Sequence, residues 1–197
     1  MGDTVVGLRE LNKERTRRAL LRAAYELFEK KGYDKTTTAE IARAAEVSPG
    51  TFFNYFATKE DLILGDRTEI IDAGLRVLRA PKRGESPAGV LLRAFEAMRT
   101  TERDDDPDDT GATRARLLFT VPSLYGAVLQ RTFDAQERLA DALRRSFPKQ
   151  LDEIEAATIV GAFVGGGIAA VRAAADRGEP LTPALMGAIR LVAENFR

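Results

Sequence analysis

The chain has 197 residues, of which 44% are apolar and 30% are charged, and its formal net charge is zero. This composition is typical of one or two globular domains and argues against a disordered chain or a protein that coats nucleic acid non-specifically. The sequence contains no Cys and no His, which excludes disulfides, Cys/His zinc sites and catalysis by a Ser-His or Cys-His pair. An enzyme that relies on carboxylates, Lys or Tyr alone stays open as an alternative.

No apolar run approaches the roughly 20 residues that span a bilayer, and residues 1–10 contain no signal-peptide core. We therefore expect a cytoplasmic protein that needs no membrane, metal or cofactor.

Helical periodicity extends along the whole chain. Apolar residues recur at three- and four-residue steps, and no stretch shows sustained period-two alternation, so the sequence predicts an all-α protein of about nine helices. The expected helices are Leu8–Lys31, Thr38–Ala45, Pro49–Phe56, Lys59–Ala80, Ser86–Glu102, Ala112–Val121, Ser123–Phe147, Leu151–Arg177 and Thr182–Phe196. Between the fifth and sixth, Arg103–Gly111 is predicted to be an acidic loop that cannot bury itself.

Three cap signals frame two short helices near the N-terminus. Thr37 and Glu40 match a capping box, Ser48 is followed by a proline at the first helical position, and Thr58 precedes the fourth helix. A turn of about three residues, Glu46-Val47-Ser48, joins the two short helices, which is the spacing of a helix-turn-helix.

In a helix-turn-helix the second helix enters the major groove of DNA. The apolar side chains that would lock the unit together are Ile41, Ala42, Ala45, Val47, Phe52 and Phe56. The opposite side would present small or polar groups to phosphates and base edges: Ser48, Gly50, Thr51, Asn54 and Tyr55. A three-helix packing unit without a role in DNA binding is the alternative.

The segment RTRRALLRAAYELFEKKGYDKTTTAEIARAAEVSPGTFFNYFATKEDLI, from about Arg15 to Ile63, resembles the DNA-binding signature of the tetracycline-repressor (TetR) family. The resemblance implies an all-helical homodimer with a DNA-binding domain at residues 1–58 and a ligand-binding and dimerisation domain at 59–197. It also implies transcriptional repression at a palindromic operator until a small ligand binds.

Carried over by position, the resemblance implies DNA contacts by Thr38, Ser48, Gly50, Thr51, Phe53, Asn54, Tyr55 and Lys59. Thr38 and Lys59 would bind phosphates from the second and fourth helices. Glu46 stands where the family commonly has Gly, and Phe53 stands where Tyr is frequent. Both differences are expected to reduce affinity without redirecting the function.

A small-residue stripe at four-residue spacing occupies the eighth helix: Gly161, Gly165, Ala169 and Ala173. Several glycines in one helix cost about 1 kcal/mol each relative to Ala, and close helix packing would compensate. A phosphate-cradling loop is a weaker interpretation, because no strand precedes the glycines. In the TetR family the last two helices form the dimer interface, so the resemblance places this stripe there.

Aromatic and apolar residues in the middle of the chain are either ordinary core or the lining of an apolar ligand cavity. The candidate lining residues are Phe95, Met98, Leu118, Tyr125 and Phe163. The segments RARLLFTVPSL, TFFNYF and LILGD are similar to an actinobacterial subset of the TetR family, which includes a mycofactocin-associated regulator that responds to long-chain acyl-CoA. An acyl-CoA is therefore one candidate for a small hydrophobic effector.

The function expected from the sequence is a ligand-responsive repressor that is not an enzyme. An activator, or a regulator that needs a corepressor, is the alternative within the same fold. The proposed lever between the two domains is the helix Lys59–Ala80.

Overall fold

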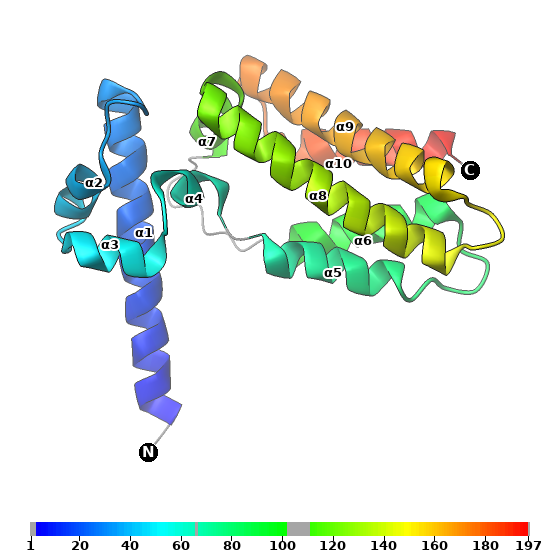
Figure 1. Ribbon diagram of the computed structural model, residues 1–197, viewed down its shortest axis with the longest axis horizontal. Helices are drawn as coiled ribbons and strands as arrows, with labels where there is room; N and C mark the ends of the chain where they lie inside the picture. Colours follow the sequence, from blue (N-terminus) through cyan, green and yellow to red (C-terminus); the bar gives the residue numbers. More distant parts are fainter. Residues whose placement is uncertain (1–2, 66, 102–110, 197) are drawn as a thin grey trace. The chain divides into compact units, whose positions relative to one another are not determined.

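The computed structural model describes residues 3–65, 67–101 and 111–196 (Figure 1). Within these ranges it contains ten helices and no strand, which confirms the all-α fold with one helix more than the expected nine. The chain divides into two compact units, one formed by Met1–Gly65 and Asp104–Leu117, the other by Asp66–Arg103 and Leu118–Arg197. The domain boundary between residues 58 and 59 stays a prediction, and the expected acidic loop lies almost wholly outside the described residues.

The first unit is built on a long helix, α1 (Asp3–Lys31), against which α2 (Thr38–Ala44) packs, while α3 (Pro49–Tyr55) packs on α2 (Figure 1). It also contains α4 (Lys59–Leu64) and most of α7 (Gly111–Thr120). Its core includes Leu20, Ile41, Phe52 and Ile63, which are all fully buried. The expectation that α1 begins at Leu8 was wrong, because a single glycine at position 7 does not stop a helix.

The helix expected over Lys59–Ala80 is two helices, so that prediction was wrong. α4 ends at Leu64, and α5 (Thr68–Leu78) begins after an interruption. Gly65 adopts φ 66° and ψ 169°, a conformation that glycine reaches without strain and that cannot continue a helix. Apolar residues keep their helical spacing across the break, which is why the sequence pattern did not reveal it.

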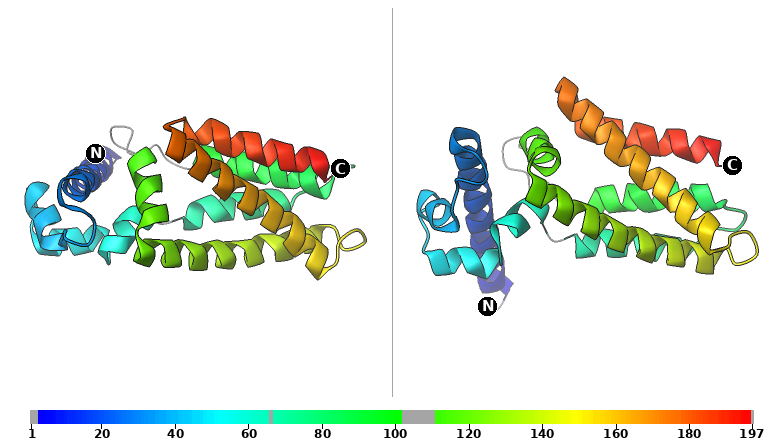
Figure 2. Two further views of the ribbon diagram at one scale, coloured as in Figure 1. Left: turned by 90° about the horizontal axis from the view of Figure 1, so that it is seen from above. Right: turned by 45° about the horizontal axis from the view of Figure 1, so that its top comes forward.

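The second unit is a ring of five helices around one core. α5 contacts α6 (Pro87–Thr101), α6 contacts α10 (Leu181–Asn195), α10 contacts α9 (Glu153–Arg177), α9 contacts α8 (Pro122–Ser146), and α8 returns to α5 (Figure 2). The core enclosed by this ring includes the fully buried Leu78, Leu91, Leu143 and Phe163.

The helix α9 is long and apolar enough to cross a membrane by length and composition, with only 22% of its most apolar window buried. The expectation that no apolar segment approaches such a length was therefore wrong. A core helix of a globular protein can pass the same test, and α9 contributes Ala156, Val160 and Phe163 to the core of its unit. Its remaining surface carries apolar residues that are exposed in the single chain, among them Ile154.

Candidate DNA-binding site

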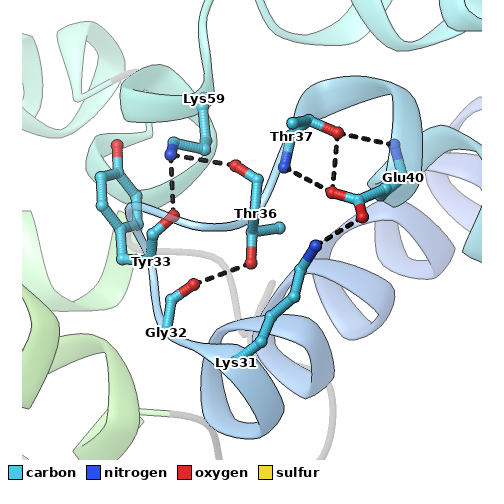
Figure 3. A network of polar contacts seen from close by, with 7 residues as sticks. All are labelled: Lys31, Gly32, Tyr33, Thr36, Thr37, Glu40 and Lys59. Atoms are coloured by element: carbon cyan, nitrogen blue, oxygen red, sulfur yellow. Dashed lines mark hydrogen bonds and ion pairs between the residues drawn. The ribbon is translucent and has the colours of Figure 1, made fainter.

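The start of α2 is fixed by a complete capping box, as the sequence predicted. Thr37 Oγ1 accepts a hydrogen bond from the Glu40 amide, and the Glu40 carboxylate accepts one from the Thr37 amide at 2.9 Å. Lys31, in the last turn of α1, forms an ion pair with the same carboxylate (Figure 3). The Lys31 ammonium and then the Thr37 groups lower the pKa of Glu40 to about 2. The pair ties α2 to the end of α1.

The turn after α2 has the hydrogen bonds of a Schellman motif. The amide of Glu46 donates to the Arg43 carbonyl, and the amide of Val47 donates to the Ala42 carbonyl at 2.9 Å. Glu46 adopts φ 57°, and among the described residues it is the one non-glycine residue with positive φ. The departure from the family's glycine therefore falls on the position of the turn that most favours glycine.

The predicted N-cap of α3 is confirmed. Ser48 Oγ accepts a hydrogen bond from the Thr51 amide at 3.0 Å and lies 2.8 Å from the Thr51 hydroxyl. Pro49 follows in the first turn, where its missing N–H costs no helical hydrogen bond.

The helix α3 has a buried face and an open one. Phe52 is fully buried and Phe56, just after the helix, is 5% exposed, whereas Phe53 is 55% exposed. Of the other predicted DNA contacts, Ser48, Gly50 and Asn54 are exposed, and Thr38, Thr51 and Tyr55 are half-buried. The open face of α3 thus carries small, polar and aromatic groups and no charge.

Lys59 is the predicted contact whose surroundings differ most from the expectation. Its ammonium donates hydrogen bonds to the carbonyl oxygens of Tyr33 at 2.8 Å and Thr36 at 3.0 Å (Figure 3). It also lies 3.9 Å from the centre of the Tyr33 ring. Two of its donors are thus directed to the loop between α1 and α2, and its phosphate contact stays a prediction.

Tyr33 and Glu60 belong to the same cluster, and sequence reasoning missed both of them. The buried Tyr33 hydroxyl donates to the Glu60 carboxylate at 2.9 Å. Burial and this acidic partner raise the pKa of Tyr33 above its ordinary value. The Gly-Tyr pair after the first helix was a visible signal, but its partner lies 27 residues further along the chain.

The end of α4 is held by α7, within the same unit. Arg114 Nε donates to the Ile63 carbonyl at 2.8 Å, and Arg114 Nη2 donates to the Leu64 carbonyl at 3.1 Å. The last carbonyls of a helix lack partners inside it and carry partial negative charge, so a guanidinium is well suited to them. Thr113 adds a hydrogen bond to Glu29 of α1.

The five candidate ligand-lining residues do not gather around one described pocket. Phe163 is fully buried and stacks on Phe95, with ring centres 5.8 Å apart. Met98 packs against Gly74 of α5, Leu118 is half-buried, and Tyr125 is 40% exposed. Two surface pockets of the second unit, one at the α8–α9 turn and one between α5 and α8, contain none of the five. The ligand site stays a prediction.

The small-residue stripe of α9 is partly exposed in the single chain. Gly165 and Ala169 are exposed, whereas Gly161 and Ala173 are half-buried. A Cβ at Gly165 would meet nothing within 4 Å, whereas one at Gly167 would lie 2.8 Å from Leu185 of α10. Contact between α9 and α10 therefore uses Gly167 and leaves Gly165 and Ala169 of the predicted dimer stripe exposed.

Two short capped helices joined by a tight turn, with one face of the second left open, define a helix-turn-helix protein. Residues 20–65 match the family described as bacterial regulatory proteins, tetR family, and residues 85–197 match the MftR C-terminal domain. The chain belongs to the TetR family of transcriptional regulators.

Curated relatives agree with this assignment. The chain is 36% identical over 151 residues to the HTH-type transcriptional regulator TcmR of Streptomyces glaucescens, covering 75% of this chain and 67% of the relative. It is 30% identical over 143 residues to the HTH-type transcriptional regulator BetI of Escherichia coli, covering 68% and 71%.

Solved structures show the same fold. FadR of Thermus thermophilus, a TetR-family transcriptional repressor in complex with lauroyl-CoA, is 25% identical, with a TM-score of 0.50 and coverage of 92% of this chain and 95% of that one. A transcriptional regulator from Aquifex aeolicus has a TM-score of 0.53 at 21% identity, covering 92% and 99%.

Proposed function

We propose that this regulator is a cytoplasmic, homodimeric repressor that binds a palindromic operator through α3 and is released by a small hydrophobic ligand. The observation that carries the proposal is the two-sided α3 helix, with Phe52 buried and Phe53 and Asn54 exposed. A helix whose apolar side is used for packing can present its open side to base edges without disturbing the fold. The proposed DNA contacts are Thr38, Ser48, Gly50, Thr51, Phe53, Asn54 and Tyr55.

Dimerisation is supported by the uncovered face of α9. Gly165 and Ala169 leave room for a second helix to approach closely, and Ile154 on the same helix is 76% exposed. Leu191 of α10 is also 62% exposed. Exposed apolar surface of this kind is stabilised when a second copy covers it. A dimer also supplies two recognition helices for two half-sites of a palindrome, about 34 Å apart along DNA.

An acyl-CoA is the proposed effector class. Its support is the likeness to the lauroyl-CoA complex of Thermus thermophilus FadR and the apolar interior of the second unit. The stacked rings of Phe95 and Phe163 fill part of that interior, and a fatty acyl chain bound there would have to displace them.

Release from DNA is a population shift between two dimer conformations. One conformation fits the operator and the other does not. A ligand that binds more tightly to the second conformation lowers occupancy of the operator, by no more than its differential affinity for the two conformations. The helix α7 is well suited to couple the units, because the boundary between them falls inside it, after Leu117. Its Arg114 holds the end of α4 in the DNA-binding unit.

The direct test measures binding to duplexes of about 30 base pairs from the promoter next to the gene by fluorescence anisotropy. We expect binding at low salt, weakened about tenfold by Asn54→Ala, which is the loss expected for one base contact. Thr100→Ala, an exposed change in α6, is the control. Failure to bind any promoter duplex at about 50 mM salt contradicts the proposal, since even non-specific binding is retained there.

The ligand is tested by adding lauroyl-CoA to the bound complex, with free CoA and lauric acid as controls. Release by lauroyl-CoA alone supports an acyl-CoA effector. Tighter DNA binding in its presence would instead assign a corepressor, and a reporter that loses expression on deletion of the gene would assign an activator.

A further inference from the structure

The ammonium of Lys59 makes three contacts inside the DNA-binding unit. A lysine ammonium has three N–H donors. Two of them bond the carbonyl oxygens of Tyr33 and Thr36 at 2.8 and 3.0 Å, and the nitrogen lies 3.9 Å from the Tyr33 ring centre, as cation–π contact requires. A phosphate oxygen that approached this half-buried group would have to compete with these partners for its donors.

Both carbonyls belong to the loop between α1 and α2, which leads directly into the Thr37 cap. Thr36 is 2% exposed, and its hydroxyl donates to the Gly32 carbonyl at 2.8 Å, so the loop also has a hydrogen bond within itself (Figure 3). Lys59 is the first residue of α4, four positions after the end of α3 at Tyr55. The Lys59 side chain therefore connects the loop that precedes α2 with the segment that follows α3.

Glu60 reinforces this connection from the neighbouring position. It accepts the Tyr33 hydroxyl at 2.9 Å, so consecutive residues of α4 bind opposite ends of the same tyrosine. The charges are also complementary, since the cation faces carbonyl oxygens and the ring face while the anion faces a hydroxyl donor.

We propose that Lys59 is a positioning residue for DNA binding, and that it acts through Tyr33 and Thr36 rather than by contacting a phosphate. Its ammonium fixes the loop before α2 to the start of α4 and so sets where Thr38 lies relative to α3. This inference rests on the proposed function, in which Thr38 and α3 contact the same duplex.

Salt dependence separates the two roles. Each lost phosphate contact reduces the slope of log Kd against log salt concentration by about 0.9, whereas a positioning residue changes Kd at constant slope. Kd is measured by anisotropy at about 50, 100 and 200 mM KCl on a duplex enriched from a random library by the wild-type protein. The variants are Lys59→Met, Lys59→Arg and, as a control for charge, Lys35→Met in the exposed part of the same loop.

We expect both Lys59 variants to bind about tenfold more weakly with an unchanged slope, because neither side chain reproduces a compact three-donor ammonium. Lys35→Met should leave the affinity near that of the wild type. If Lys59→Arg binds like the wild type while Lys59→Met loses about 0.9 of slope, the residue binds a phosphate and the proposal is overturned. Unchanged affinity in Lys59→Met overturns it as well.

Amide hydrogen exchange over residues 32–37 is an independent readout without DNA. We expect exchange there to be at least about tenfold faster in both Lys59 variants and unchanged in Lys35→Met. Unchanged exchange in the Lys59 variants overturns the proposal that Lys59 holds this loop, even if operator binding is weakened. If the wild type enriches no duplex, the proposed function fails, while exchange still decides whether Lys59 holds the loop. Circular dichroism of each variant monitors folding. If Lys59→Met does not fold, Lys59→Arg, which retains the charge, serves as the test variant.

Discussion

The guanidinium of Arg114 in α7 donates a 2.8 Å hydrogen bond to the carbonyl of Ile63 in α4, across 51 positions of sequence. A second bond, to Leu64, places the cation on the last two carbonyls of the helix. This pairing brings a helix from the middle of the chain into the unit that contains the helix-turn-helix.

Replacing Arg114 by Met is expected to loosen the last turn of α4. Hydrogen bonds from charged groups contribute roughly 1.5–3 kcal/mol, and because Arg114 is half-buried we expect a loss of about 1–2 kcal/mol in the opening free energy of α4 amides. Hydrogen exchange measures this loss. Arg83→Met, in the exposed turn before α6, removes the same charge and should leave α4 unchanged.

Glu46→Gly is expected to stabilise the protein. The left-handed backbone at φ 57° costs a non-glycine residue about 1 kcal/mol, so the variant should unfold at higher temperature. Glu46→Ala removes the same charge but keeps a Cβ, and it should show no such gain. Equal melting temperatures for the Gly and Ala variants would contradict the assignment of strain to this residue.

Acid is expected to weaken the link between α1 and α2. The pKa of Glu40 falls from an ordinary value of 4.5 to about 2 in the folded chain, chiefly through Lys31. A carboxyl with a depressed folded pKa contributes stability that is present above about pH 5 and lost as the pH falls toward 2. Urea unfolding of Glu40→Gln should therefore show a weaker pH dependence across this window than the wild type or Glu26→Gln.

Ala169→Glu is expected to shift the protein from dimer to monomer, because it places a charge on the uncovered stripe of α9. Sedimentation at micromolar concentration measures the mass. Thr100→Glu, on the exposed side of α6, adds the same charge away from the stripe and should remain dimeric. A wild-type protein that sediments as a monomer would contradict the dimer itself.

Short-range signals predicted the helix-turn-helix well. The caps at Thr37, Ser48 and Thr58 are all formed, because each depends on residues only three positions apart. The break at Gly65 was missed because apolar spacing continues on both sides of it and a single glycine is tolerated in many helices.

Contacts distant in sequence could not be predicted from local pattern. Lys59 matches a phosphate-binding position of the family, yet two of its donors bond carbonyls 23 and 26 positions earlier. Backbone carbonyls leave no signature in the residue types that carry them. The apolar residues around Phe95 and Phe163 also satisfy the pattern of an ordinary core and of a ligand cavity equally well.

The hydrogen bonds from α7 to the end of α4 constrain how the DNA-binding unit of this protein can be fused to another domain. A graft that joins residues 1–65 to a foreign effector domain at one junction leaves Arg114 behind, and the final carbonyls of α4 then lose both of their charged donors. We therefore expect a chimera to be more stable when it carries residues 111–117 together with residues 1–65, which makes the transferable unit discontinuous in sequence.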